Sequence, residues 1–215
     1  MLHLRNRYAP WVDEELLDAA EAVLIEEGFD GVSLERVAER ADRSRVTLWR
    51  QGVTKDTLIT GLLQRLTDDF QSTFWPVLTG AGSGRERLEA SIQALFDVAD
   101  RHLDLLAISD QVFHWAAERC EFPAGSMGFL GPFVGALRLG AEDGSLRLPG
   151  RTEESADVVF NTACWGYVHL RHRHRWSRAR ARTQVTAILI HGVAHGTDPA
   201  RDVVIRRSPE GGSEG

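Results

Sequence analysis

The 215-residue sequence lacks the features that mark secreted and membrane-embedded proteins. It has only two cysteines, Cys120 and Cys164, which form neither a spaced framework nor a CxxC pair. A reducing, cytoplasmic interior is therefore the simplest location. No run approaches the roughly 20 apolar residues of a membrane helix, so no membrane partner is expected. No apolar run follows the first cations either, so no secretory signal is expected in these residues.

The common catalytic signatures are absent as well. GxSxG, HExxH, GxGxxG and the Walker phosphate loop do not occur. Asp110 and His114 are spaced i, i+4, but no nucleophile accompanies them. His191 and His195 share a helical face, yet no cysteine or carboxylate pattern completes a metal-ligand set. We therefore expect no enzyme, no cofactor and no metal. If the chain has no site for nucleic acid, the alternative function is that of an all-helical ligand-binding protein or enzyme without DNA recognition.

Lysine is almost missing, and the overall charge is acidic. Lys55 is the only lysine, and the formal net charge is -6. This balance excludes nucleic-acid binding by the whole surface, so any such binding must be local. Two basic stretches are candidates: "SRVTLWRQGVTK" at 44–55 and the more highly charged "HLRHRHRWSRARAR" at 169–182.

Apolar residues recur at i, i+3 and i+4 throughout the chain, while β-branched alternation is scarce. The sequence therefore predicts an all-α fold. The first helix ends at Gly28, and a fourth begins after Thr54 and ends near Trp75, before Pro76. Pro132 should kink or split the helix that contains it. Later helices are expected at about 85–101, 103–120, 126–143, 153–175 and 178–195.

Residues 33–52 have the pattern of a helix-turn-helix. Ser33 and Ser44 are suited to cap two short helices, and Gly52 suits the end of the second. Asp42 lies in the short turn and tolerates a left-handed backbone. Leu48 anchors the second helix, which leaves its other side chains exposed. Residues 33–55 hold six basic and three acidic side chains, a local charge of +3.

The first quarter of the chain resembles the DNA-binding region of TetR-family transcriptional regulators. The residues that carry the resemblance are Gly28, Phe29, Ser33, Val37, Ala38, Ala41, Ser44, Thr47, Leu48 and Lys55. The resemblance implies an N-terminal three-helix helix-turn-helix domain at 1–57 and a larger helical ligand-binding and dimerisation domain at 58–197. A mobile tail is expected at 198–215. It also implies a homodimeric repressor that a small-molecule effector releases from a pseudo-palindromic double-stranded operator.

The candidate DNA contacts follow from the resemblance and from side-chain chemistry. They are Ser33, Arg43, Ser44, Arg45, Val46, Thr47, Trp49, Arg50 and Lys55. Arg45 suits the acceptors of guanine, and Val46 suits a thymine methyl group. Arg43 could instead be solvated or pair with Glu39. Asp42, Arg43, Val46, Trp49, Gln51 and Gly52 depart from the family's usual residues, so base specificity cannot be carried over.

The rest of the chain gives weaker signals. We interpret the basic stretch at 169–182 as a solvated, self-repelling corner. Aromatic side chains near glycines in the middle of the chain could line an effector pocket. Its candidate residues are Phe113, His114, Trp115, Phe129, Phe133 and Trp165. A helix pair at 153–195 is expected to form the dimer interface, through Val159, Ala163, Leu170, Val185, Ile188, Leu189 and Gly192.

Overall fold

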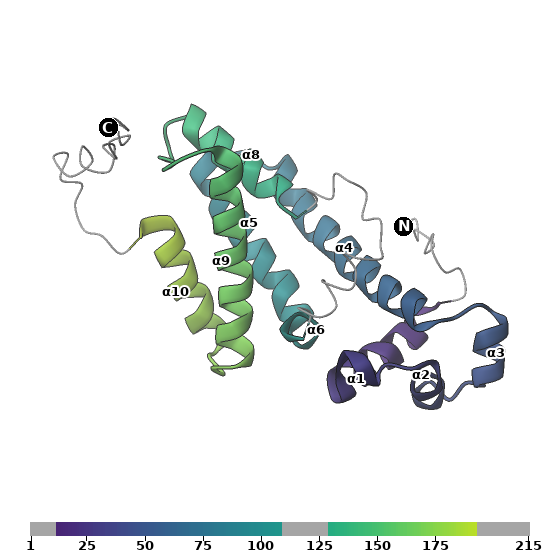
Figure 1. Cartoon of the computed structure of the whole chain (residues 1–215). Coiled ribbons are helices and arrows are strands. Elements are labelled where there is room, and N and C mark those ends of the chain that lie inside the picture. The colour runs from purple at the N-terminus through teal and green to yellow at the C-terminus, as the bar shows by residue number, and fades with distance from the viewer. Residues whose placement is uncertain (1–11, 109–128, 193–215) are drawn as a thin grey trace, which may run out of the picture.

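The structure is a computed structural model that describes residues 12–108 and 129–192. Every regular element in these two ranges is a helix, and no residue of the two ranges lies in a strand. The helices are α1 Glu14–Gly31, α2 Leu34–Arg40, α3 Arg45–Arg50, α4 Lys55–Thr79, α5 Gly84–Arg101, α6 Leu103–Ala107, α8 Gly131–Glu142, α9 Thr152–His172 and α10 Arg178–His191 (Figure 1). No described helix is long and apolar enough to cross a membrane.

Several sequence predictions fall on residues outside this description. They are the pocket residues Phe113, His114 and Trp115, the Asp110–His114 pair, Cys120, His195 and the tail from residue 198.

The predicted caps Ser33 and Ser44 begin α2 and α3, whereas α1 continues past its predicted end at Gly28 to Gly31. Asp13 accepts a hydrogen bond from the Leu16 amide at 3.0 Å and begins α1. Gly28 then breaks the helical path with a φ of 74°. Asp42 has a φ of 50°, as expected for the turn between α2 and α3. Gly52, with a φ of 76°, follows the end of α3.

The first hydrophobic core holds α1, α2, α3 and the start of α4 together at one end of the molecule (Figure 1). Leu16, Leu24, Leu48 and Leu58 are almost completely buried in it. This core continues along α4 as far as Leu63. The boundary proposed at residue 57 therefore lies within a continuous helix, and the two cores meet along that helix.

α4 extends further than the sequence predicted. Its expected end near Trp75 is wrong, because the helix continues through Pro76 to Thr79. Proline removes only one amide donor, and the last turn has other support. The Thr79 hydroxyl donates to the Trp75 carbonyl at 3.0 Å. Val77, beyond the proline, packs on the second core.

The second core lies among α4, α5, α8, α9 and α10. Phe96 and Tyr167 stack at its centre, with ring centroids 4.2 Å apart. α5 and α8 approach closely because Gly84 and Gly140 meet there; a Cβ on Gly84 would be 1.9 Å from the Gly140 nitrogen. The expected kink at Pro132 is not seen in the described residues. Pro132 lies in the first turn of α8, where its missing N–H costs no helical hydrogen bond.

α6 connects the two cores through adjacent residues. Leu105 is buried in the first core, and Leu106 is buried in the second. The same short helix packs on α9 and on α1. α4 and α6 are therefore two described elements through which the N-terminal helices and the second core are in direct contact.

Candidate nucleic-acid interface

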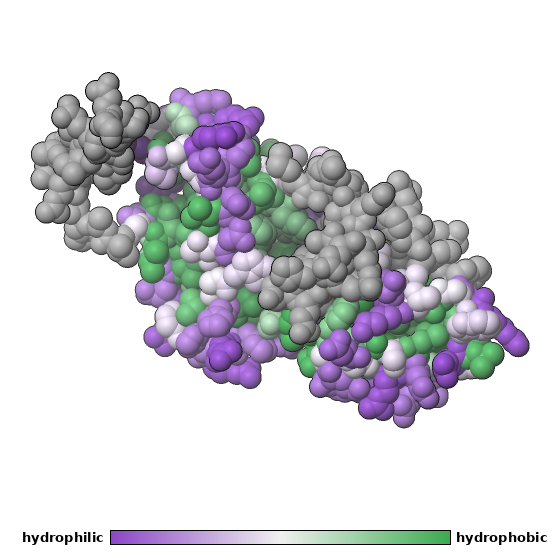
Figure 2. All heavy atoms as spheres, in the orientation of Figure 1, coloured by the Kyte–Doolittle hydropathy of each residue, from purple (hydrophilic) through white to green (hydrophobic). Residues whose placement is uncertain are grey.

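α3 presents one buried side chain and an exposed face, as the sequence predicted. Leu48 is buried in the first core. Val46 is 55% exposed and Trp49 is 70% exposed, which are high fractions for large apolar side chains. Arg45 and Arg50 flank them and are also exposed. At the position of α3, Figure 2 shows hydrophobic atoms beside hydrophilic ones. This combination of guanidinium groups and apolar contacts suits the edges of bases in a DNA groove.

The two candidate serines and Thr47 also hold the helices in place. The Ser33 hydroxyl accepts a hydrogen bond from the Arg36 amide at 3.3 Å. The Ser44 hydroxyl accepts one from the Thr47 amide at 3.4 Å. Both serines are exposed, so each hydroxyl can still donate its own proton. Ser33, Ser44 and Thr47 can therefore bind a phosphate oxygen while they keep their positions in the caps.

Most of the positive charge at 33–55 is paired inside the N-terminal helices. Arg36 bonds Glu27 at 3.0 Å, and Arg40 bonds Glu26 at 2.7 Å. These pairs join α2 to the end of α1. The arginines of α2 are therefore largely neutralised by acids of the neighbouring helix.

Arg43 takes part in the same internal pairing. It bonds Asp13 at 2.8 Å and Glu15 at 2.6 Å, and not Glu39. The left-handed turn at Asp42 directs the chain toward the start of α1, where these acids lie. Burial would raise the pKa of Asp13, but the Arg43 bond and the Leu16 amide outweigh it and lower the pKa.

Lys55 contacts α1 instead of pointing freely into solvent. Its ammonium donates to the Phe29 carbonyl and lies 4.1 Å from the centre of the Phe29 ring. This contact fixes the start of α4 to the end of α1. Any phosphate contact by Lys55 must share the ammonium with this carbonyl.

The unpaired positive charge of the interface is concentrated on α3. Arg45 approaches Glu35 only to 4.0 Å, and both side chains are well exposed. Arg50 forms no ion pair with any residue in the described ranges. The local charge that the sequence assigned to 33–55 is thus available mainly at the two arginines of the exposed helix.

Of the predicted effector-pocket residues, only Phe129, Phe133 and Trp165 lie in the described ranges. Phe129 contacts Phe70, with ring centroids 4.7 Å apart, and Phe133 contacts Phe160 at 5.6 Å. These aromatic rings belong to the second core. Trp165 instead lines an open groove between α6 and α9. Trp165 therefore lines a different surface of the described helices from Phe129 and Phe133.

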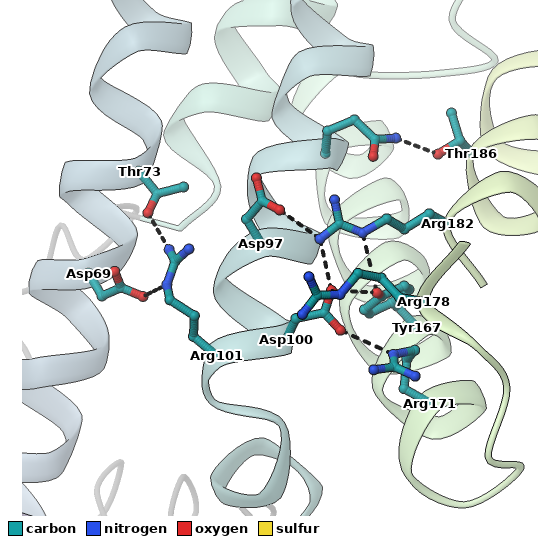
Figure 3. Close-up of polar contacts among 11 residues, drawn as sticks. Asp69, Thr73, Asp97, Asp100, Arg101, Tyr167, Arg171, Arg178, Arg182 and Thr186 are labelled. Carbon is teal, nitrogen blue, oxygen red and sulfur yellow. Dashed lines mark hydrogen bonds and ion pairs between the residues drawn. The ribbon is translucent and has the colours of Figure 1, made fainter. Parts of the chain in front are cut away.

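The interpretation of 169–182 as a solvated, self-repelling corner is also wrong in part. Arg171, Arg178 and Arg182 surround Asp100, whose side chain is only 2% exposed (Figure 3). Tyr167 donates to the same carboxylate at 2.8 Å. Burial would raise the pKa of Asp100, but the bonds from Arg182, Tyr167 and Arg171 outweigh it and lower the pKa. The basic stretch therefore fixes α9 and α10 to α5.

Comparison with known proteins agrees with this geometry. The family described as "Bacterial regulatory proteins, tetR family" matches residues 16–60, which cover α1 to the start of α4. The HTH-type transcriptional activator FasR of Mycolicibacterium smegmatis is 31% identical over 83 residues. That match covers 39% of this chain and spans only 38% of the length of FasR.

Two solved structures show the same fold over most of the chain. One is the transcriptional regulator FadR from Bacillus subtilis in complex with stearoyl-CoA, with a TM-score of 0.66 and 16% identity. It matches 84% of this chain and 98% of that one. The other is the ketosteroid transcriptional regulator KstR2 of Mycobacterium tuberculosis, with a TM-score of 0.69 and 20% identity. It matches 88% of this chain and all of that one.

Proposed function

Because this chain belongs to the TetR family of transcriptional regulators, we propose that it binds a pseudo-palindromic operator as a homodimer and is released by a small-molecule effector. The observation that carries the proposal is α3, a helix with one buried anchor, Leu48, and an exposed face that holds two arginines and two apolar side chains. The internal pairing of the other cations supports the same site.

The chemistry of α3 suggests how the operator is read. Arg45 can form two hydrogen bonds to the O6 and N7 atoms of a guanine in the major groove. Val46 and Trp49 offer apolar surface that suits thymine methyl groups and sugars. Ser33, Ser44, Thr47 and Lys55 are assigned to the phosphate backbone. We assign Arg43 to the structure of the domain, because two carboxylates already hold it.

Enrichment of genomic fragments on the purified protein would test operator binding. An inverted repeat should be recovered, and its affinity should then be measured by fluorescence anisotropy. Arg45→Ala should cost about 1–3 kcal/mol on the best site and relax the preference at one base pair of each half-site. Arg36→Ala is a matched control, because it removes an arginine that already pairs with Glu27. If wild-type protein prefers no sequence, the proposal is refuted.

The exposed faces of α9 and α10 support a dimer that uses some of the expected residues, among them Ile188, but not all of them. Ala163 and Val185 are buried in the protein's own second core, so they cannot form the interface. Val158 and Ile188 are exposed, the latter by 52%. Figure 2 shows hydrophobic atoms over α10 and beside α9.

Light scattering on the purified chain would test the dimer. Wild-type protein should have the mass of two chains at micromolar concentration. Ile188→Glu should give a folded monomer, because the side chain is already exposed and its replacement need not disturb the core. Ile25→Glu, at another exposed apolar position on α1, is the control and should remain dimeric. A wild-type monomer would contradict this part of the proposal.

The effector is proposed to be apolar or amphipathic. Two relatives are described as a complex with stearoyl-CoA and as a ketosteroid regulator. An effector that favours one arrangement of the helices would alter DNA affinity through α4 and α6, which connect the two cores. The sign of regulation is proposed as repression. FasR is named an activator, so a reporter gene placed behind the recovered operator should distinguish the two signs.

A further inference from the structure

An open groove between α6 and α9 combines an apolar floor with a basic end. Its volume is about 610 Å³, within the range of small-molecule sites. The apolar floor consists of Leu106, Ala107, Trp165 and Val168, and the basic end consists of His169, His172, Arg173 and Arg175.

The two arginines at this end are exposed and have no acidic partner in the described part of the chain. Arg171, Arg178 and Arg182 are bound to Asp100, but neither Arg173 nor Arg175 forms an ion pair with any acid in residues 12–108 and 129–192. An acidic side chain of the described residues, Asp104, lies 3.8 Å from His172. The basic end therefore keeps an excess of positive charge.

The backbone at Arg175 is a second, independent observation. Its φ is 56°, in the left-handed region where glycine is favoured. Other residues there cost about 1 kcal/mol or more. The turn after α9 is closed by the Trp176 amide, which donates to the Leu170 carbonyl at 3.0 Å. Glycine would form this turn with less strain. Arginine at this position therefore costs backbone strain that glycine would avoid, and it adds a guanidinium group to the lining of the groove.

From these observations we infer that the groove binds an organic anion with an apolar body. The apolar part lies on Trp165, Leu106 and Val168, and Arg173 and Arg175 hold the carboxylate, sulfonate or phosphate. A guanidinium group suits such an anion, because it can donate two parallel hydrogen bonds to one acidic group.

The position of the groove gives ligand binding a consequence for the N-terminal helices. Leu106 lines the groove, and its neighbour Leu105 is buried in the first core. A ligand that displaces α6 must therefore change the packing of α1. Only this coupling step rests on the proposed DNA binding. The binding site itself does not.

Fluorescence titration of the full-length protein with 1-anilinonaphthalene-8-sulfonate would test the site. The probe has an aromatic body and a single sulfonate. Arg173→Gln with Arg175→Gln should weaken binding by about tenfold or more, since two charge-assisted contacts are lost. Arg138→Gln with Arg151→Gln removes the same charge elsewhere on the surface and should leave the affinity unchanged.

Two further variants make the test independent of folding. Arg175→Gly keeps the left-handed turn and removes the guanidinium, so it should weaken probe binding without lowering the melting temperature. Trp165→Ala should weaken both the sulfonate probe and neutral N-phenyl-1-naphthylamine, whereas the arginine variants should weaken only the sulfonate. Equal sulfonate affinity in the Arg173/Arg175 variant and the Arg138/Arg151 control would overturn the inference.

Operator binding, measured on the same variants without probe, separates this inference from the proposed function. Retained operator binding with lost probe binding supports the groove as a ligand site. If the wild-type protein binds no operator but the arginine variants lose the probe, the groove stands and the proposed function fails.

Discussion

The Asp100 cluster allows a quantitative prediction about stability. Asp100→Asn keeps the shape of the side chain but removes its charge and turns one acceptor into a donor. The carboxylate is 2% exposed and accepts from Tyr167 and Arg182 at 2.8 Å each. It also contacts Arg178 at 2.9 Å and Arg171 at 3.1 Å. The substitution leaves these donors facing an amide.

The magnitude follows from how well each partner can return to water. Arg178 is already exposed, so water can replace its bond to Asp100 at little cost. Arg171 and Arg182 are mostly buried and cannot be solvated as easily. Breaking a buried ion pair by removing one partner costs about 3–5 kcal/mol. Because one arginine can be resolvated, we expect a loss near the lower end, about 3 kcal/mol in the free energy of unfolding.

Urea unfolding followed by circular dichroism at 222 nm would measure this loss. Protein concentration must be fixed, because the stability of a dimer depends on it. Asp97→Asn is the matched control on the same helix: Asp97 is 49% exposed and bonds only Arg182 among the described residues. It should cost about 1 kcal/mol or less. If Asp100→Asn costs no more than Asp97→Asn, the cluster does not hold α10 in place and the reasoning is refuted.

Three other predictions concern the C-terminal helices. The pKa of Asp100 is lowered in the folded state, so the ionised carboxylate stabilises the fold. This stabilisation is fully present above about pH 4 and is lost as the pH falls through the lowered pKa. Asp100→Asn should therefore flatten the pH dependence of the melting temperature below pH 4. Gly84→Ala should lower the free energy of unfolding by about 1–3 kcal/mol, and calorimetry would show it, because the new methyl group meets the Gly140 backbone. Burial raises the pKa of Cys164 to about 12, so in a Cys120→Ser variant a disulfide reagent should release almost no thiolate signal at pH 8 until urea is added; rapid reaction of the folded variant would contradict this.

The N-terminal helices could be predicted from sequence because their signals are local. Ser33 and Ser44 each cap a helix three residues before the amide they accept from. Gly28 marks the kink in α1 and Gly52 follows the end of α3, each through its own backbone conformation. The exposed face of α3 followed from one apolar anchor in six residues. Each of these inferences needs only a few neighbouring residues.

The sequence analysis missed contacts between residues that lie far apart in the chain. The basic stretch looked self-repelling because its main partner, Asp100, lies 71 residues before Arg171. The ion pair of Arg43 was missed because its partner Asp13 lies 30 residues earlier. The dimer residues were chosen by apolar period alone, which does not distinguish the protein's own core from an exposed face. Ala163 and Ile188 fit the same pattern, yet one is buried and the other is exposed.

The length of α4 determines how finely DNA binding can be controlled. A helix of 25 residues is about 37 Å long. If its end in the second core were held and the helix tilted by about 5°, the other end would move by about 3 Å. Successive base pairs are about 3.4 Å apart along the DNA axis. A tilt too small to disrupt the packing of either core would thus shift α3 by nearly one base pair, enough to place it out of register with its half-site.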